Sequence, residues 1–296
     1  MQQVINALTL GSIYLLFSLG LTLAWGTLKV LNLAHGAVFV FASLIGFLVT
    51  HKFGLSFPLV VGLGMLGAGL LTLLIDAIVF KRIRQISRDE RQAELLMLAA
   101  SLGVAAILAS VTRNLTLESH NFGLTPQTFT TIPYFFGPIR VTNMQFMIVF
   151  LGVGLVVALA LWIRYSRAGR ALRALAYDPA TCGLMGVNPT SLSAIAMFIA
   201  GAMAGLAGIL LTVYLGAIGP EAGDSLMLKA FSIIVLGGVG SVWGALVGAM
   251  FLAAAESIVL NFTAGGYVDA IAFGMIILVL LIRPRGIIPA EKADRV

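Results

Sequence analysis

Long apolar runs separated by short polar stretches dominate the sequence. Runs of this length predict membrane-spanning helices, because about 20 apolar residues are needed to cross a hydrocarbon core of about 30 Å. We expect spans at approximately residues 5–28, 33–51, 58–80, 94–112, 144–164, 192–215, 242–261 and 267–282. A further apolar stretch, 228–239, is too short to cross alone and is expected to form a half-crossing or a short hairpin arm.

The composition supports this interpretation. Hydrophobic residues make up 60% of the chain and charged residues 10%, whereas an average soluble domain is about 45–50% apolar and 25% charged. The apolar runs are continuous rather than alternating, which favours helices over a transmembrane β-barrel. We therefore predict an all-α, polytopic membrane bundle of about eight full spans plus one short half-crossing. Gly201 and Gly205 repeat at a spacing of four, which is typical of closely packed membrane helices.

The basic residues gather in three places, and membrane orientation follows Lys and Arg in short loops. The clusters are Lys81, Arg82, Arg84, Arg88 and Arg91; Arg164, Arg167, Arg170 and Arg173; and Arg283, Arg285, Lys292 and Arg295. We expect all three in the cytoplasm, with the C-terminus. The N-terminus has no Lys or Arg before Lys29 and is expected outside. This arrangement needs an odd number of crossings, which the segment 228–239 can supply.

Residues 164–191 form a basic, polar island between two apolar runs. Within it, Asp178 is suited to cap a helix N-terminus, Pro179 to the first helical position and Gly186 to the left-handed residue after a helix end. The helix so bracketed has fewer than two turns. Isolated helices shorter than about 12 residues are marginal in water, so this one needs a partner surface.

Most catalytic chemistry is excluded by the sequence. No GxxxxGK[ST] phosphate-binding loop is present, so the chain is not expected to hydrolyse ATP by itself. His35, His51 and His120 are far apart and no Cys/His cluster has metal-ligand spacing, so no metal site is expected. No serine sits in a GxSxG elbow, which argues against a hydrolase. The single Cys182 is expected to be a small buried thiol.

Three carboxylates fall inside or near the ends of apolar spans. A charge at the centre of a membrane helix costs at least about 2.5 kcal/mol, so each requires a partner or water. Asp76 lies one turn from a basic cluster and Asp269 near the outer surface, which leaves Glu256 as the deep carboxylate. Glu256 is either a packed or paired residue, or a proton relay in a self-sufficient secondary carrier.

The segment Asn32-Leu33-Ala34-His35-Gly36 places polar side chains where one apolar run passes into the next. Transporter helices often unwind where they line a cavity, because freed backbone groups find partners there. The alternative is a plain interfacial turn, with Lys29 and His35 among the headgroups. The sequence leaves both interpretations open.

Three blocks of the chain resemble a known family. They are NLAHG in the first hairpin, IRYSRAGRALRALAYDPATCGLMGVNP in the middle, and KAFSIIVLGGVGSVWGALVGA followed by IRPRG near the end. The blocks are similar to the LivH-type permeases of branched-chain amino acid ABC transporters. The resemblance implies a single transmembrane permease domain over residues 1–296 in a bacterial cytoplasmic (inner) membrane, without enzymatic activity of its own.

The resemblance also implies partners. They are a second homologous permease, two cytoplasmic ATPases that hold ATP and Mg²⁺, a periplasmic substrate-binding protein and the surrounding lipid, with no cofactor in this chain and no nucleic acid. The cargo is expected to be a branched-chain or other neutral amino acid, with urea or amides as the alternative within the same family.

Two sets of site residues follow from the resemblance. The island would carry the helix that docks on an ATPase, with Ala180 at the position that is acidic in the usual pattern. The coupling residues are Asp178, Pro179, Ala180, Thr181, Cys182, Gly183, Leu184, Met185 and Gly186. The translocation path would be lined by Asn32, His35, Phe39, Ser43 and Glu256.

Overall fold

The computed structural model describes most of the chain. The residues described are 2–28, 31–116, 121–124, 130–137, 139–177, 182–183, 185–186, 188–238, 240–262 and isolated positions beyond them. Seven helices within this part are long and apolar enough to cross a membrane, which confirms the predicted all-α, polytopic fold class. The predicted span at 267–282 falls largely outside the described residues.

The elements follow the predicted apolar runs closely. In chain order they are α1 (Gln2–Leu28), α2 (Ala34–Phe53), α3 (Phe57–Ile75), a π-helix (Asp76–Phe80), α4 (Lys81–Ile86), α5 (Glu90–Leu115), strands β1 (Pro133–Phe136) and β2 (Ile139–Thr142), α6 (Asn143–Tyr165), α7 (Arg167–Tyr177), α9 (Pro189–Leu215), α10 (Ala222–Gly237) and α11 (Val242–Phe262). The strands form an antiparallel hairpin that the sequence analysis did not foresee.

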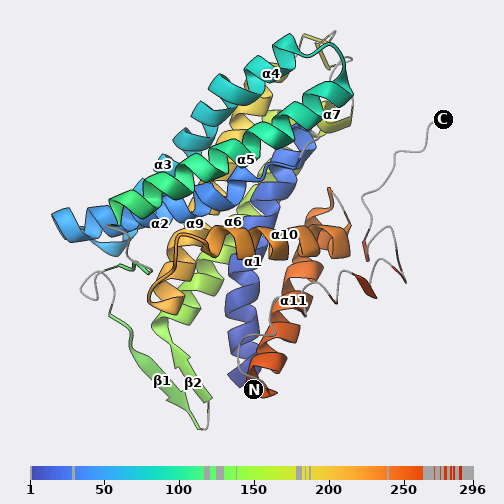
Figure 1. The fold of residues 1–296 in the computed structure, drawn as a ribbon. Helices are drawn as coiled ribbons and strands as arrows, with labels where there is room; N and C mark the ends of the chain where they lie inside the picture. Colours follow the sequence, from blue (N-terminus) through green and yellow to red (C-terminus); the bar gives the residue numbers. More distant parts are fainter. Residues whose placement is uncertain are drawn as a thin grey trace.

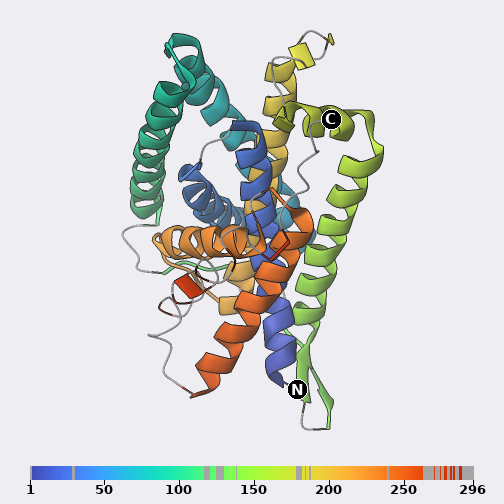
Figure 2. The same cartoon turned by 90° about the vertical axis from the view of Figure 1, so that its right-hand side faces the viewer.

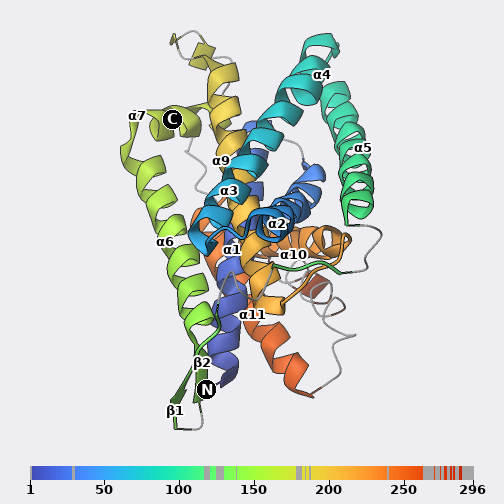
Figure 3. The same cartoon turned by 90° about the vertical axis from the view of Figure 1, so that its left-hand side faces the viewer.

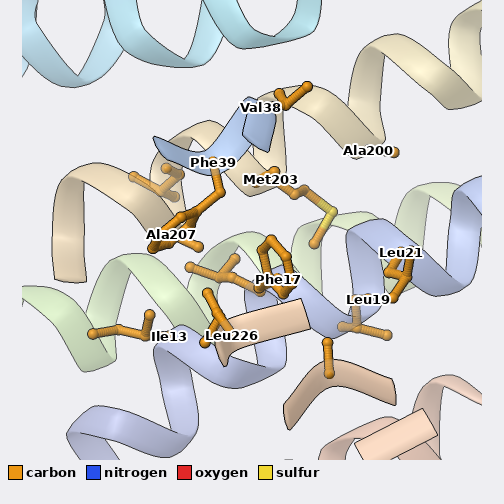
Figure 4. Packing of buried hydrophobic residues seen from close by; sticks show 14 of the residues in the cluster. Ile13, Phe17, Leu19, Leu21, Val38, Phe39, Ala200, Met203, Ala207 and Leu226 are labelled. Carbon is orange, nitrogen blue, oxygen red and sulfur yellow. The ribbon is translucent and has the colours of Figure 1, made fainter. Parts of the chain in front are cut away.

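Helices α1 and α9 form the centre of the bundle (Figure 1). In each, 72% of the most apolar stretch is buried, compared with 17% in α6 and 22% in α5. Phe17, Phe39 and Met203 meet between α1, α2 and α9 in the core (Figure 4). Against α3, a Cβ on Gly205 would lie 2.7 Å from the Ala68 Cβ. The predicted small-residue face is therefore a close helix contact.

The segment 228–239, predicted to be a half-crossing or a hairpin arm, lies largely within helix α10, which begins at Ala222 and ends at Gly237. With 16 residues, α10 is about 24 Å long and is shorter than a full crossing. It lies crosswise to α1 and α11 (Figures 1 and 2). Its first turn meets that of α2, where a Cβ on Gly36 would lie 2.5 Å from the Gly223 carbonyl oxygen.

Two basic clusters lie at one end of the bundle. Helices α4 and α7 are at this end, whereas the N-terminus and the β1–β2 hairpin are at the opposite end (Figure 3). This is the relative placement that the positive-inside rule predicts. The cluster at 81–91 was expected to be a loop but is largely helical, because α4 continues from α3 through the π-helix and α5 begins at Glu90. That the basic end is cytoplasmic stays a prediction.

Candidate functional site

A sharp corner joins α6 to the basic island. Helix α6 ends at Tyr165, Ser166 is extended, and the chain turns directly into α7. The Ser166 hydroxyl accepts a hydrogen bond of 2.8 Å from the Gly169 backbone N–H, so Ser166 caps the start of α7. Helix α7 (Arg167–Tyr177) was not predicted: only the short helix between Asp178 and Gly186 was expected within this island.

Helix α7 is amphipathic, with its apolar side against the bundle. Leu172 and Leu175 are buried together with Leu192 and Ala196 at the start of α9. The opposite side carries three exposed arginines, Arg167, Arg170 and Arg173. The signal for this helix was present in the sequence, because arginines at every third residue and leucines on the opposite side are typical of an amphipathic helix.

The predicted coupling helix is described only in part. Asp178, Pro179, Ala180, Thr181 and Leu184 lie outside the described residues. Cys182 and Gly183 are helical, and Cys182 is buried against Leu172, Leu175 and the start of α9, which confirms the expected buried thiol. Gly186 has φ +79°, the left-handed conformation predicted for the residue after a helix end.

The exposed part of this segment is next to the point where α9 begins. Met185 is 78% exposed, which is unusual for a large apolar side chain outside the lipid-facing helices. Beyond it, the Asn188 side chain accepts hydrogen bonds from Thr190 and Ser191 and caps α9. The segment is therefore fixed to the bundle through Cys182 and presents Met185 outward.

The polar corner between α1 and α2 is buried inside the bundle. The Asn32 side chain accepts a hydrogen bond of 3.1 Å from the Ala34 N–H, and the Leu33 N–H donates to Ser101 of α5. His35 is completely buried, with its Nε2 3.3 Å from the Phe17 carbonyl oxygen. The expectation of His35 among lipid headgroups was therefore wrong, because the corner folds inward between α1, α2 and α5.

Phe39 and Ser43 continue the buried stripe that begins at His35. The Phe39 ring meets the Phe17 ring edge-on at 5.5 Å (Figure 4). Ser43 is buried and donates back to the Phe39 carbonyl. Within this chain the stripe packs against α1 and α9, and a role in lining a path between two permeases stays a prediction.

Glu256 on α11 is held in a buried cluster with Tyr14 and Lys229. The Tyr14 hydroxyl donates a hydrogen bond of 2.6 Å to Glu256 Oε2. Lys229 Nζ forms an ion pair with Glu256 Oε1 at 3.0 Å and donates a hydrogen bond of 3.2 Å to the Tyr14 hydroxyl oxygen. The pairing interpretation of Glu256 is therefore the one that the contacts favour.

The sequence analysis missed Lys229 as the partner of Glu256. The only signal was a lone lysine in an otherwise apolar stretch, which itself requires compensation in a membrane. Asp76 was expected to need a partner and to lie near a basic cluster. Its carboxylate accepts a hydrogen bond of 2.8 Å from Arg84 of that cluster.

Comparison with known proteins identifies the family. Residues 3–280 match the family described as the permease component of branched-chain amino acid transport systems. The chain is 32% identical to the permease LivH of Salmonella typhimurium, over all of this chain and 97% of the relative. It belongs to this permease family. Further relatives are BraD of Pseudomonas aeruginosa, 31% identical over all of this chain and 98% of BraD, and LivM of Escherichia coli, 27% identical over 97% of this chain and 70% of LivM.

For a branched-chain amino acid transport permease, the described geometry divides naturally into two regions. The end with α4 and α7 carries exposed basic side chains and a short segment anchored by Cys182. The interior carries a buried polar corner at Asn32 and His35 and a buried ion pair at Glu256. The first region is exposed and basic, and the second is a set of buried contacts between helices.

Proposed function

We propose that this protein is the permease subunit of an ABC importer for branched-chain or other neutral amino acids. In this proposal it pairs with a second, related permease in a bacterial cytoplasmic membrane, receives its cargo from a periplasmic binding protein, and is driven by two cytoplasmic ATPases that hold ATP and Mg²⁺. The chain acts as a single permease domain with no enzymatic activity of its own. The full-length similarity to LivH, a permease of high-affinity branched-chain amino acid transport, supports the cargo class.

One structural observation carries the proposal: the segment 182–186 is anchored on one side and open on the other. Cys182 and the α7 leucines fix it to the start of α9, while Met185 and the arginines of α7 remain exposed. A short helix presented in this way has the form expected of a lever on which an ATPase acts. The similarity to both LivH and LivM supports a pair of related permeases.

A pair of glycine variants tests the coupling role. Gly186→Pro forces φ from +79° to about −65° and should prevent the segment from ending in its present form. Gly137→Pro is the matched control, because it makes a similar change from φ +61° with nothing within 4 Å, in the β1–β2 hairpin at the opposite end of the bundle. We expect ATPase subunits to bind the control as they bind the wild type and to bind Gly186→Pro at least about tenfold more weakly. Equal binding to both variants would contradict the coupling role.

The cargo is tested by uptake into proteoliposomes that contain the complete importer. Leucine, isoleucine and valine should compete with one another for ATP-dependent uptake, and urea and small amides should not. Competition by urea alone would assign the chain to the alternative cargo. Uptake by this chain alone in a proton gradient, abolished by Glu256→Gln, would instead indicate a secondary carrier.

A further inference from the structure

Two of the exposed arginines of α7 are not free to serve a partner. The Arg170 guanidinium donates a hydrogen bond of 2.8 Å to the carbonyl oxygen of Tyr165, and the Arg173 guanidinium donates to that of Ile163. Both carbonyls belong to the last turn of α6. The last four carbonyls of a helix have no partner within the helix, and a cation at this end also interacts favourably with the helix dipole. Arg170 and Arg173 thus cap α6 from outside.

The same corner is closed by close backbone packing. A Cβ on Gly169 would lie 2.5 Å from both the Cα and the carbonyl oxygen of Ile163, so only glycine allows α7 to cross the end of α6 at this distance. Four residues therefore fix the geometry of the corner: Ser166, Gly169, Arg170 and Arg173. The corner between α6 and α7 is therefore a stiff joint, held by directional hydrogen bonds and by a close approach of two backbones.

The contacts of α7 with α9 are of another kind. They are apolar, through Leu172 and Leu175 against Leu192 and Ala196. Apolar contacts are non-directional and permit small sliding movements, as in shear between packed helices. Helix α9 is also held in the core, whereas most of the apolar surface of α6 lies outside it. Of the two long helices that precede and follow α7 and the coupling segment, α6 can be displaced at lower cost than α9.

We infer that Arg170 and Arg173 make α6 and α7 one rigid body, so that a displacement of the coupling segment tilts α6 while α9 stays in place. This inference rests on the proposed function for its biological meaning, because the displacement would come from the ATPases. Arg170 and Arg173 are positioning residues in this mechanism and need not contact an ATPase. Arg167, which belongs to the same exposed stripe but caps no carbonyl of α6, supplies the matched control.

The stiffness of the joint can be measured by distances between spin labels. Phe150 on α6 and Ala176 on α7 are both exposed, and each can be replaced by cysteine. Cys182 is buried and is kept, and the chain without the two new cysteines, treated with the same label, is the control for its reactivity. In the assembled transporter in lipid nanodiscs, we expect one narrow distance distribution that keeps its mean when ATP is added. Arg170→Met with Arg173→Met should broaden the distribution, and Arg167→Met should leave it unchanged.

Transport supplies the second measurement. Both hydrogen bonds are exposed to solvent, so losing each should raise the population of a released corner by about threefold and losing both by about tenfold. In the Arg170→Met, Arg173→Met variant we expect the amount of cargo transported per ATP to fall by about tenfold, while ATPase binding stays within about twofold of the wild type. Lysine at both positions keeps a cationic donor and should restore most of the ratio. Gly169→Ala should uncouple similarly, whereas Gly154→Ala on the open side of α6 should not.

The outcomes separate this inference from the proposed function. An unchanged distance distribution in the double variant, or equal broadening by Arg167→Met, would overturn the rigid joint. Weaker ATPase binding to Arg167→Met and to the double variant alike, with transport per ATP unchanged, would also overturn it and assign the arginines to docking. If ATPases do not bind the wild-type chain at all, the proposed function fails, whereas the distance measurement on the permease still tests the joint.

Discussion

Replacing Glu256 by glutamine should destabilise the protein strongly, and replacing Lys229 by methionine as well should recover much of the loss. The Glu256 side chain is 2% exposed and that of Lys229 is 12% exposed, with 3.0 Å between their charged atoms. At an effective dielectric constant of about 20, charges at this distance attract by about 5 kcal/mol before the cost of desolvation. Removing one partner of such a pair costs about 3–5 kcal/mol, because the other charge stays buried.

The contacts around Lys229 place the expected loss toward the lower end of this range. Lys229 keeps the Tyr14 hydroxyl oxygen at 3.2 Å and the Tyr14 ring at 5.4 Å after Glu256 is neutralised. We therefore expect Glu256→Gln to lower the free energy of unfolding by about 3 kcal/mol and Lys229→Met by a similar amount. The double variant, which leaves no buried charge, should lose about 1–2 kcal/mol in all, since replacing both ions is often nearly neutral.

A double-mutant cycle in mixed detergent micelles, with unfolding followed by circular dichroism, measures the coupling between the two residues. Tyr14→Phe is the control, because it removes the hydroxyl that donates to the carboxylate at 2.6 Å and accepts from Lys229 at 3.2 Å but leaves the two ions paired, and it should cost about 1.5–3 kcal/mol. If the loss of unfolding free energy in the double variant equals the sum of the two single losses to within about 0.5 kcal/mol, the ion-pair reasoning is refuted.

The same variants separate two functions for Glu256. If Glu256 only pins helices together, the double variant should keep ATP-driven uptake within about threefold of the wild type at a temperature where it is folded. If Glu256 relays protons, every variant without this carboxylate should lose uptake, including the double variant. Recovery of stability together with complete loss of transport would contradict the structural role argued from the contacts.

Two further predictions concern packing and capping. Gly205→Val should lower the melting temperature of the purified protein by several degrees, because its Cβ would lie 2.7 Å from the Ala68 Cβ on α3, whereas Gly154→Val, which faces open space, should change it little. Asn32→Ala should cost about 1 kcal/mol in the same unfolding assay, because it removes the acceptor of the Ala34 N–H. Asn32→Ser, which keeps a short neutral acceptor oxygen, should cost clearly less, and equal losses would argue against the role of this hydrogen bond.

The sequence predicted the helices well and their contacts poorly, for a physical reason. A bilayer requires long continuous apolar runs, so the spans can be read from hydropathy alone. Helix α7 was missed because its apolar side has only Leu172 and Leu175, and four arginines dominate the stretch around them. The ending of the coupling segment at Gly186 was predictable, since few residues besides glycine adopt φ +79°.

The hydropathy of the sequence does not indicate which residues of distant spans contact one another. Tyr14 and Glu256 are 242 residues apart in the chain, and nothing local in either stretch indicates the other. The contact between Asp76 and Arg84 could be predicted, because two opposite charges eight residues apart near a helix end can meet within one local segment. For Lys229 and Glu256 the sequence indicates only that each ion in an apolar stretch requires a partner, and it does not indicate which residue that partner is.

The fixed contacts also indicate which helices stay together during transport. Helix α10 is held at its start by the close approach of Gly223 to Gly36 on α2, at its middle by Lys229 with Tyr14 and Glu256, and at its end by the close approach of Gly237 to Gly244 on α11. A helix held at three points to α1, α2 and α11 cannot move without breaking a buried ion pair or separating packed backbones. Movement is therefore cheaper at α6, which has no such ion pair among the described residues and is held to α7 by Arg170 and Arg173. In the proposed mechanism, the crosswise helix therefore belongs to the static part of the permease, and the joint at Ser166 to the part that moves.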